Sequence, residues 1–135
     1  MTPPIHAAAP LRLSFAGGGT DFPHYFEQHG GAVLSATIDR FAQATLLPRD
    51  DEQIVLRSLD LGHLVEYHLD RGPDYDGVMD LPKAAIARIG VPTGVDVEIR
   101  SDAPAGSGLG GSSALVTAVV GALAMLAGRR LIPTA

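Results

Sequence analysis

Apolar and polar residues alternate through much of the first hundred positions, a spacing that predicts β-strands rather than helices. The apolar residues Leu11, Leu13 and Phe15 alternate with polar ones, which indicates a half-buried strand with these three side chains toward the core. Arg12, one of the polar residues, is therefore expected on the opposite face. Further strands are predicted over residues 32–38, 41–47, 54–59, 63–69 and 95–99. The segment 48–52, with its proline and acids, predicts a turn that joins the strands on either side of it as a hairpin.

Three segments carry helix signals. A short helix is predicted over residues 23–29, because proline stands at its start and a glycine pair follows it. A second helix is predicted between the capping residue Asp80 and Gly90. The residues of its buried stripe are Ala85, Ile86 and Ile89. A third helix is predicted over 114–127; its apolar stretch of about 15 residues is shorter than the roughly 18 to 20 that a bilayer span needs, so we expect it to be buried.

The composition is that of an ordinary globular chain. Of the 135 residues, 46% are hydrophobic and only 5% aromatic, which predicts a core of alanine, valine, leucine and isoleucine. The formal net charge is -5, Lys83 is the only lysine and the arginines are scattered, which argues against nucleic acid and anionic membranes as partners. The absence of cysteine excludes a disulfide scaffold and a thiolate nucleophile, and fits a reducing compartment such as the cytoplasm. Residues 1–10 lack the regions of a signal peptide, so we expect a short disordered lead before a domain at 11–135.

The most informative stretch is the glycine-rich loop at residues 104–113, between the predicted strand 95–99 and the predicted helix 114–127. Four glycines within six residues let backbone N–H groups turn inward without a clash from a Cβ atom. The following helix adds its free N–H groups and the positive end of its dipole at the same place. This order of strand, loop and helix predicts an anion site that can hold a phosphate without a lysine. The alternative is a tight loop that binds nothing.

Four common uses of a glycine-rich turn do not fit this loop. The spacing of Gly106, Gly108 and Gly111 matches a dinucleotide fingerprint, but that site needs an acidic residue about 20 positions later. No aspartate or glutamate follows Asp102. A P-loop needs a lysine in the loop and a protein kinase needs one on a nearby strand, whereas the single lysine lies in a predicted helix. Residues 110–114 are close to a hydrolase nucleophile elbow, yet neither an acid nor a histidine follows the serines.

Two stretches, in the right order, resemble motifs of one kinase superfamily. Residues 12–21, Arg-Leu-Ser-Phe-Ala-Gly-Gly-Gly-Thr-Asp, resemble the first motif of the GHMP kinases, named for galactokinase, homoserine kinase, mevalonate kinase and phosphomevalonate kinase. Residues 104–114 resemble the second motif. The first motif looks most like that of bacterial sugar kinases of the D-glycero-D-manno-heptose 7-phosphate kinase type. The resemblance implies an α+β nucleotide-binding domain, with a mixed or antiparallel sheet and helices on one face, that transfers the γ-phosphate of ATP to a sugar hydroxyl, expected to be the anomeric one.

The resemblance also implies roles for residues of both motifs. The loop amides would wrap the phosphates of ATP, and the Ser112 hydroxyl, with Ser113 as the adjacent possibility, would meet Mg²⁺. Arg12 would act as a catalytic residue that offsets charge near the transferred phosphate, and Asp21 would accept hydrogen bonds from sugar hydroxyls. The phosphate-binding set is Gly106, Ser107, Gly108, Leu109, Gly110, Gly111, Ser112 and Ser113. The substrate-binding set is Gly18, Gly19, Thr20 and Asp21.

The chain departs from the family pattern in three ways. Gly18 and Gly19 stand where galactokinase has a Glu-His pair, so the galactose contacts of that enzyme do not transfer. Gly111 replaces a serine that is common at its loop position. In the family the chain continues into a metal-binding glutamate, in many members a catalytic aspartate, and a second domain, whereas this sequence ends at Ala135. We therefore expect a fragment, part of the N-terminal ATP-binding domain without the C-terminal domain, that is inactive alone and self-associates or pairs with the missing half.

Plainer structural roles compete with these assignments. Asp21 is alternatively the N-cap of the short helix that follows it, and Ser112 the cap of the last helix. Arg12 alternatively pairs with a carboxylate at a sheet edge. The five histidines show no ligand spacing, so no metal site is assigned to them. A second class of function stays open, a non-catalytic nucleotide-binding or regulatory remnant of such a kinase, and the sequence does not determine which sugar is the substrate.

Overall fold

The computed structural model describes residues 3–130, which form one five-stranded sheet and three helices. The strands are β1 (Ile5–Ala16), β2 (Leu34–Pro48), β3 (Gln53–Ser58), β4 (His63–His68) and β5 (Val95–Ser101). The helices are α1 (Pro23–His29), α2 (Asp80–Ile89) and α3 (Gly111–Leu126). The strand order is β1-β2-β5-β3-β4; β3 and β5 are parallel, and every other neighbouring pair is antiparallel. This mixed sheet confirms the predicted α+β class.

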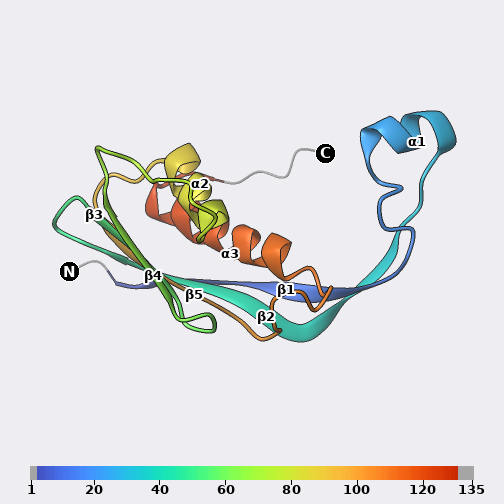
Figure 1. Cartoon of the computed structure of the whole chain (residues 1–135), viewed down its shortest axis with the longest axis horizontal. Coiled ribbons are helices and arrows are strands. Elements are labelled where there is room, and N and C mark those ends of the chain that lie inside the picture. Colours follow the sequence, from blue (N-terminus) through green and yellow to red (C-terminus); the bar gives the residue numbers. More distant parts are fainter. Residues whose placement is uncertain (1–2, 131–135) are drawn as a thin grey trace.

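Helices α2 and α3 cover one face of the sheet and contact each other, as Figure 1 shows. The core between the layers is built mainly from alanine, valine, leucine and isoleucine, as the composition predicts. Of the predicted stripe on α2, Ala85 and Ile86 are buried and Ile89 is half-buried. The opposite face of the sheet is polar; there the Arg100 Nε donates to Gln43 Oε1 over 3.1 Å. No helix within residues 3–130 is long and apolar enough to cross a membrane.

Strand β1 begins earlier than the sequence indicates. The prediction of a disordered lead over residues 1–10 is wrong for residues 5–10, which pair with residues 41–46 of β2. Ala9 in this part of the strand is 6% exposed and belongs to the core. Alanine and proline have little strand propensity, so the local sequence carries no strand signal here and the pairing partner determines the conformation. Met1 and Thr2 lie outside the described residues.

The two strands predicted over 32–38 and 41–47 form the single strand β2, which bends at a bulge. Pro10 of β1 pairs with Phe41, but Arg12 pairs with Thr37, so three residues of β2 lie opposite one residue of β1. Beyond this bulge β1 and β2 continue past the N-terminus of α3 (Figure 1). Leu13 and Phe15, predicted to face the core, are therefore 41% and 63% exposed.

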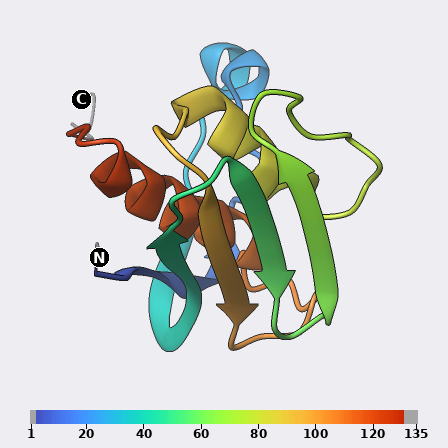
Figure 2. The ribbon, with the colours of Figure 1, turned by 90° about the vertical axis from the view of Figure 1, so that its left-hand side faces the viewer.

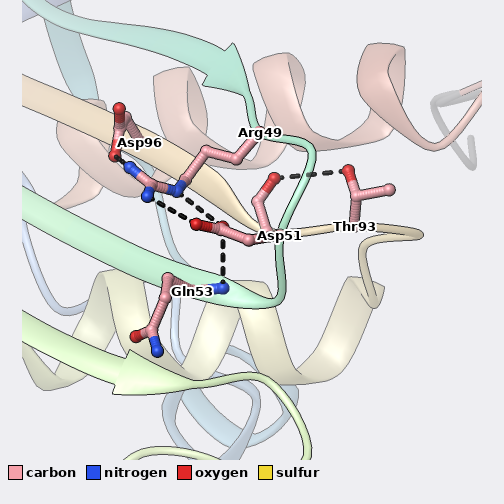
Figure 3. Close-up of polar contacts among 6 residues, drawn as sticks. Arg49, Asp51, Gln53, Thr93 and Asp96 are labelled. Carbon is pink, nitrogen blue, oxygen red and sulfur yellow. Dashed lines mark hydrogen bonds and ion pairs between the residues drawn. The ribbon is translucent and has the colours of Figure 1, made fainter.

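The predicted hairpin of β2 and β3 is wrong, because β5 lies between these strands (Figure 2). Figure 3 shows the polar contacts at this junction. The Arg49 guanidinium donates to both carboxylate oxygens of Asp51, at 2.7 Å each, and to Asp96 of β5 at 2.9 Å. These bonds from Arg49, with one from the Gln53 backbone N–H, lower the pKa of Asp51 to about 2. The proline and acids thus mark a true turn, but its ion pairs hold the incoming β5 rather than a two-stranded hairpin.

Candidate functional site

The glycine-rich loop follows β5 and is anchored to the sheet at both ends. At its start, the Asp102 carboxylate accepts a hydrogen bond from the Phe41 N–H at 2.8 Å, and the Asp102 N–H donates to the Phe41 carbonyl at 2.9 Å. At its end, the Leu109 carbonyl accepts a hydrogen bond from the Arg12 N–H at 3.0 Å. Residues 104–108, between these anchors, are exposed. The strands β1 and β2 therefore hold the loop in place while its middle faces solvent.

Three glycines of the loop adopt left-handed backbone conformations. The φ angles are 78° at Gly106, 73° at Gly108 and 71° at Gly110. Residues with a Cβ atom adopt such angles only with strain, whereas glycine does not. A Cβ atom added to Gly106 or Gly108 would meet no other atom within 4 Å. Glycine is thus required at these two positions by the backbone conformation, not by lack of space.

The loop and the start of α3 form one wall of a cavity of about 330 Å³. Seven of the eight residues predicted to bind phosphate line this cavity; Leu109 is the exception and packs toward the core. The N-cap of α3 is Gly110, and no side chain forms a capping hydrogen bond there. The alternative role of Ser112 as the helix cap is therefore not supported, and the first N–H groups of α3 are available to an anion.

The oxygen donors of this cavity suit a magnesium ion that arrives with phosphate. Within residues 3–130, no group of three or more His, Asp or Glu side chains could hold a metal ion. The Ser112 hydroxyl lines the cavity at the start of α3. Mg²⁺ keeps several water ligands and commonly binds through one or two protein groups together with substrate phosphates. The residues present thus fit Mg²⁺ carried by a nucleotide, and not a metal held by the protein alone.

Arg12 lies beside the loop rather than in its cavity. A Cβ atom added to Gly110 would come within 3.3 Å of Arg12 Cγ and Nε, so this side chain packs against the end of the loop. Arg12 lines a separate hollow of about 190 Å³ together with Ser113 and Thr117. Among residues 3–130 Arg12 forms no ion pair, which leaves the alternative role at a sheet edge without support.

Residues 17–33 form an arm that carries α1 away from the sheet (Figure 1). The two sides of the arm approach so closely that a Cβ atom on Gly17 would lie 1.7 Å from the Ala32 carbonyl oxygen. A Cβ atom on Gly31 would lie 2.0 Å from the Thr20 carbonyl oxygen. The Thr20 hydroxyl joins the two sides: it lies 2.8 Å from the Gly17 carbonyl oxygen and accepts a hydrogen bond from the Ala32 N–H at 3.1 Å. Close backbone approach at the two glycines and the hydrogen bonds of the Thr20 hydroxyl therefore close the arm.

The predicted substrate-binding set lies on this arm. The Asp21 carboxylate accepts a hydrogen bond from the Gly19 N–H at 3.2 Å. The N-cap of α1 is Phe22, so the alternative role of Asp21 as a helix cap is not supported. Thr20 and Asp21 line a hollow of about 440 Å³, whereas Gly18 and Gly19 do not. The structure thus brings half of this set together, in a hollow separate from the cavity of the glycine-rich loop.

Replacing Gly17 with alanine is expected to open the arm. The new methyl group would overlap the Ala32 carbonyl oxygen, and the φ of 82° at Gly17 adds strain. If the overlap raises the free energy of the closed arm by about 3 kcal/mol, the population of molecules with an open arm rises about 100-fold. The rate of limited proteolysis within residues 17–33 should rise by the same factor. Gly18→Ala is the matched control, because its nearest contact, Ser14 Oγ at 3.7 Å, is an ordinary one. Equal cleavage rates in the two variants would show that the arm does not depend on this close approach.

A second cavity, of about 300 Å³, adjoins the first and was not predicted from the sequence. The residues that line both cavities are Asp60, Leu61, Ser112 and Leu115. Part of its lining is apolar: Leu61 and Leu81 line this cavity although they are 53% and 56% exposed. Met79, at another wall, has a φ of 54°, which is uncommon for a residue other than glycine. The only sequence signal for this cavity is the pair of leucines, Leu59 and Leu61, in a turn where polar residues are usual.

The only lysine of the sequence is buried beneath the segment that precedes α2. Lys83 Nζ donates to the Asp74 carbonyl oxygen and to the Asp76 carboxylate at 2.7 Å each, and to the Asp80 carboxylate at 3.4 Å. Burial alone would lower the pKa of Lys83, but the bonds to both carboxylates outweigh it and the pKa is raised. The bond from Lys83 lowers the pKa of Asp76. A charged Lys83 therefore holds the segment that supplies part of the second cavity's wall, a role that the sequence does not reveal because lysine is rarely buried.

Known proteins are similar to this chain in sequence and in fold. The chain is 40% identical over 125 residues to D-glycero-alpha-D-manno-heptose 7-phosphate kinase of Campylobacter jejuni, in an alignment that spans 89% of this chain and 37% of that protein. A D-glycero-D-manno-heptose 1-phosphate kinase from Bacteroides thetaiotaomicron superposes with a TM-score of 0.85 at 32% identity, over 94% of this chain and 43% of that one. Lactococcus lactis galactokinase, solved with galactose, superposes with a TM-score of 0.79 at 24% identity, over 97% and 34% of the two chains, which shows the same fold.

The chain spans less than half the length of each of these relatives. Residues 78–134, which contain the glycine-rich loop and most of both cavities' helical walls, match the family model of the GHMP kinases N terminal domain. The resemblance that the motifs at 12–21 and 104–114 indicate is thereby confirmed. Residues 78–134 are thus identified as part of a GHMP kinase N-terminal domain, and most of the chain is similar in sequence and fold to the heptose kinases.

Proposed function

We propose that the two joined cavities bind ATP with Mg²⁺, and that the protein containing this domain transfers the γ-phosphate to a hydroxyl of a sugar or sugar phosphate, such as a heptose 7-phosphate. The observation that carries the proposal is the glycine-rich loop, whose left-handed glycines open onto a cavity at the N-terminus of α3. The attacked hydroxyl is expected to be the anomeric one. The names of the heptose kinase relatives support the sugar class.

The phosphate end of the site neutralises charge with backbone groups. The described lining of the loop's cavity contains no lysine or arginine, but it contains residues of the glycine-rich loop, the start of α3 and four serines, Ser101, Ser107, Ser112 and Ser113. Backbone N–H groups, fixed before the ligand arrives, stabilise phosphate charge without reorganisation. Phosphoryl transfer depends mainly on positioning and charge neutralisation. When bound, Mg²⁺ would supply the remaining positive charge at the phosphates, with Ser112 as its protein ligand.

The nucleoside end fits the second cavity. Small-molecule sites are mostly apolar with a few polar groups that fix orientation. The walls formed by Leu61, Met79 and Leu81 would contact the faces of a purine, and two polar residues of this cavity, Asp60 and Ser112, also line the first one. The two cavities are adjacent, because four residues line both of them. One nucleotide could therefore place its phosphates in the first cavity and its base in the second, with the ribose beside the shared residues.

The sugar side of the proposal rests on the arm. Asp21 would accept hydrogen bonds from sugar hydroxyls, with Thr20 beside it in the same hollow and Gly18 and Gly19 in the preceding turn. Arg12 packs against the end of the glycine-rich loop, a place from which its charge would offset that of the transferred phosphate without lining the cavity. Arg12 lies in β1 and Asp21 in the turn that follows it, so the single segment 12–21 would connect the sugar with the phosphate.

The test is a calorimetric titration of the 135-residue chain with Mg-ATP, after gel filtration has shown a monodisperse sample. We expect one ATP per chain, displacement of ATP by tripolyphosphate because both use the loop amides, and weaker binding of adenosine, which has no phosphate. With heptose 7-phosphate added, we expect no ADP release above background by the isolated chain; multiple turnovers would overturn that expectation. A folded sample that binds neither ATP nor tripolyphosphate would contradict the proposed nucleotide site.

A further inference from the structure

We propose that the Asp60 carboxylate accepts hydrogen bonds from the ribose hydroxyls of the nucleotide, so that the site selects ribonucleotides over deoxyribonucleotides. This inference rests on the proposed binding of ATP in the two joined cavities. It assigns a role in specificity to a residue of the turn between β3 and β4, which lies outside both sequence motifs.

Asp60 lies where the ribose of a bound nucleotide would lie. Asp60 is one of the four residues that line both cavities, and it is the only one of the four with a charged side chain. In ATP the ribose lies between the phosphates and the base. If the phosphates lie in the loop's cavity and the base in the second cavity, the ribose must pass along the wall that the two share. A carboxylate on that wall faces a sugar that carries two hydroxyl donors.

The turn fixes this carboxylate from within the fold. The Ser58 hydroxyl donates to Asp60 Oδ1 at 2.9 Å, and Ser58 itself is only 4% exposed. The Gly62 N–H donates to the Ser58 carbonyl, and the Leu59 N–H donates to the Ile99 carbonyl of β5, both at 2.9 Å. Asp60 is thus held by a buried hydroxyl on a turn that is bonded to the neighbouring strand. Among the described residues no donor contacts Asp60 Oδ2, so this oxygen is free to accept hydrogen bonds from a ligand.

The chemistry of a carboxylate favours the hydrogen-bond donors of ATP, which are the ribose hydroxyls and the adenine amino group. Of these, the ribose hydroxyls would lie at the wall shared by the two cavities, where Asp60 stands. An ionised carboxylate only accepts hydrogen bonds, and the phosphates of ATP offer no donors but repel its charge. The other carboxylate that lines the second cavity, that of Asp80, already accepts from the Gly77 N–H at 3.0 Å and from Lys83 Nζ at 3.4 Å. Asp60 is therefore the carboxylate of the described site that has both the position and the free acceptor for a ribose hydroxyl.

The experiment compares ATP, 2′-deoxyATP, 3′-deoxyATP and tripolyphosphate in calorimetric titrations of the 135-residue chain. We expect ATP to bind about tenfold more tightly than the analogue that lacks the bonded hydroxyl, the effect of one hydrogen bond to a partly solvated charge. In Asp60→Ala this preference should disappear while tripolyphosphate binds as tightly as before or more tightly. Asp50→Ala, which removes the same charge from the turn at the opposite end of β3, is the matched control and should keep the preference.

The possible outcomes separate this inference from the proposed function. Equal binding of ATP and both deoxy analogues by the unaltered chain would overturn the ribose contact and leave the nucleotide site standing. If Asp60→Ala binds tripolyphosphate and all three nucleotides more weakly by the same factor, the ribose contact is also overturned. Such a result would show that Asp60 only supports the turn or the metal. If the folded, unaltered chain binds neither ATP nor tripolyphosphate, the proposed function fails and the inference fails with it. Loss of the preference in Asp60→Ala alone supports the proposal.

Discussion

Replacing Gly108 with valine is expected to lower the affinity of the chain for Mg-ATP about 100-fold, equivalent to losing one or two hydrogen bonds to the charged phosphates. The φ of 73° at Gly108 is a conformation that β-branched valine adopts only with strain. Residues 104–108 are exposed and a Cβ atom at Gly108 would meet nothing within 4 Å, so the loop can relieve this strain by changing its own conformation. The changed loop would then turn its amides away from the phosphates, while the fold persists.

Gly72→Val separates this effect from strain in general. Gly72 has a φ of 71° and no atom within 4 Å of a Cβ, which matches Gly108, but it lies between β4 and α2 and lines neither cavity. We expect this variant to bind Mg-ATP as the unaltered chain does, in titrations accompanied by circular dichroism to confirm folding. Equal loss of affinity in both variants, or unchanged affinity in Gly108→Val, would contradict the assignment of the loop as the phosphate site.

The parts of the fold that the sequence predicts correctly are those with local causes. The helix at 23–29 appears as α1 with the predicted bounds, because proline and glycine set both of its ends. The strand predicted over 63–69 appears as β4, because the alternation of side chains that predicts it lies within one six-residue segment. The failures concern partners distant in the sequence: the pairing of residues 5–10 with β2, and the place of β5 between β2 and β3. Local patterns predict where a strand lies but not which strand it pairs with.

The candidate site divides in the same way. The conformation of the glycine-rich loop could be predicted because it depends on glycines within one short segment, and three of them do have positive φ. The second cavity could not, because its walls come from the turn after β3, the segment before α2 and the start of α3, which meet only in the folded chain. Lys83 illustrates the difference: the sequence places it correctly in a helix, but only the fold shows that it is buried beneath Asp76. The roles of Arg12 and Asp21 toward a substrate stay predictions.

Gly94→Ala is expected to lower the free energy of unfolding by about 3 kcal/mol, the upper part of the usual range for overpacking. Gly94 is buried immediately before β5, and an added Cβ atom would lie 2.4 Å from the Gln53 carbonyl oxygen and 2.6 Å from that of Asp51. Both of these are backbone atoms, held by the ion pairs of Arg49 and by the hydrogen bonds of β3, so neither can move aside locally. Urea unfolding followed by circular dichroism measures the loss as a lower midpoint.

The Gly94→Ala substitution should also disturb the candidate site at the opposite end of the sheet. Strands β3 and β5 leave this junction in parallel, and each leads to one wall of the site. Ser58 of β3 pairs with Ile99 of β5, just before the turn that carries Asp60 and the loop that carries the glycines. A variant that separates the two strands should therefore lose Mg-ATP affinity together with stability. Gly121→Ala, in α3 with no atom within 4 Å of the added Cβ, is the control and should raise stability by up to about 1 kcal/mol. If Gly94→Ala is as stable as the unaltered chain, the close approach of Gly94 to Gln53 does not hold these strands together.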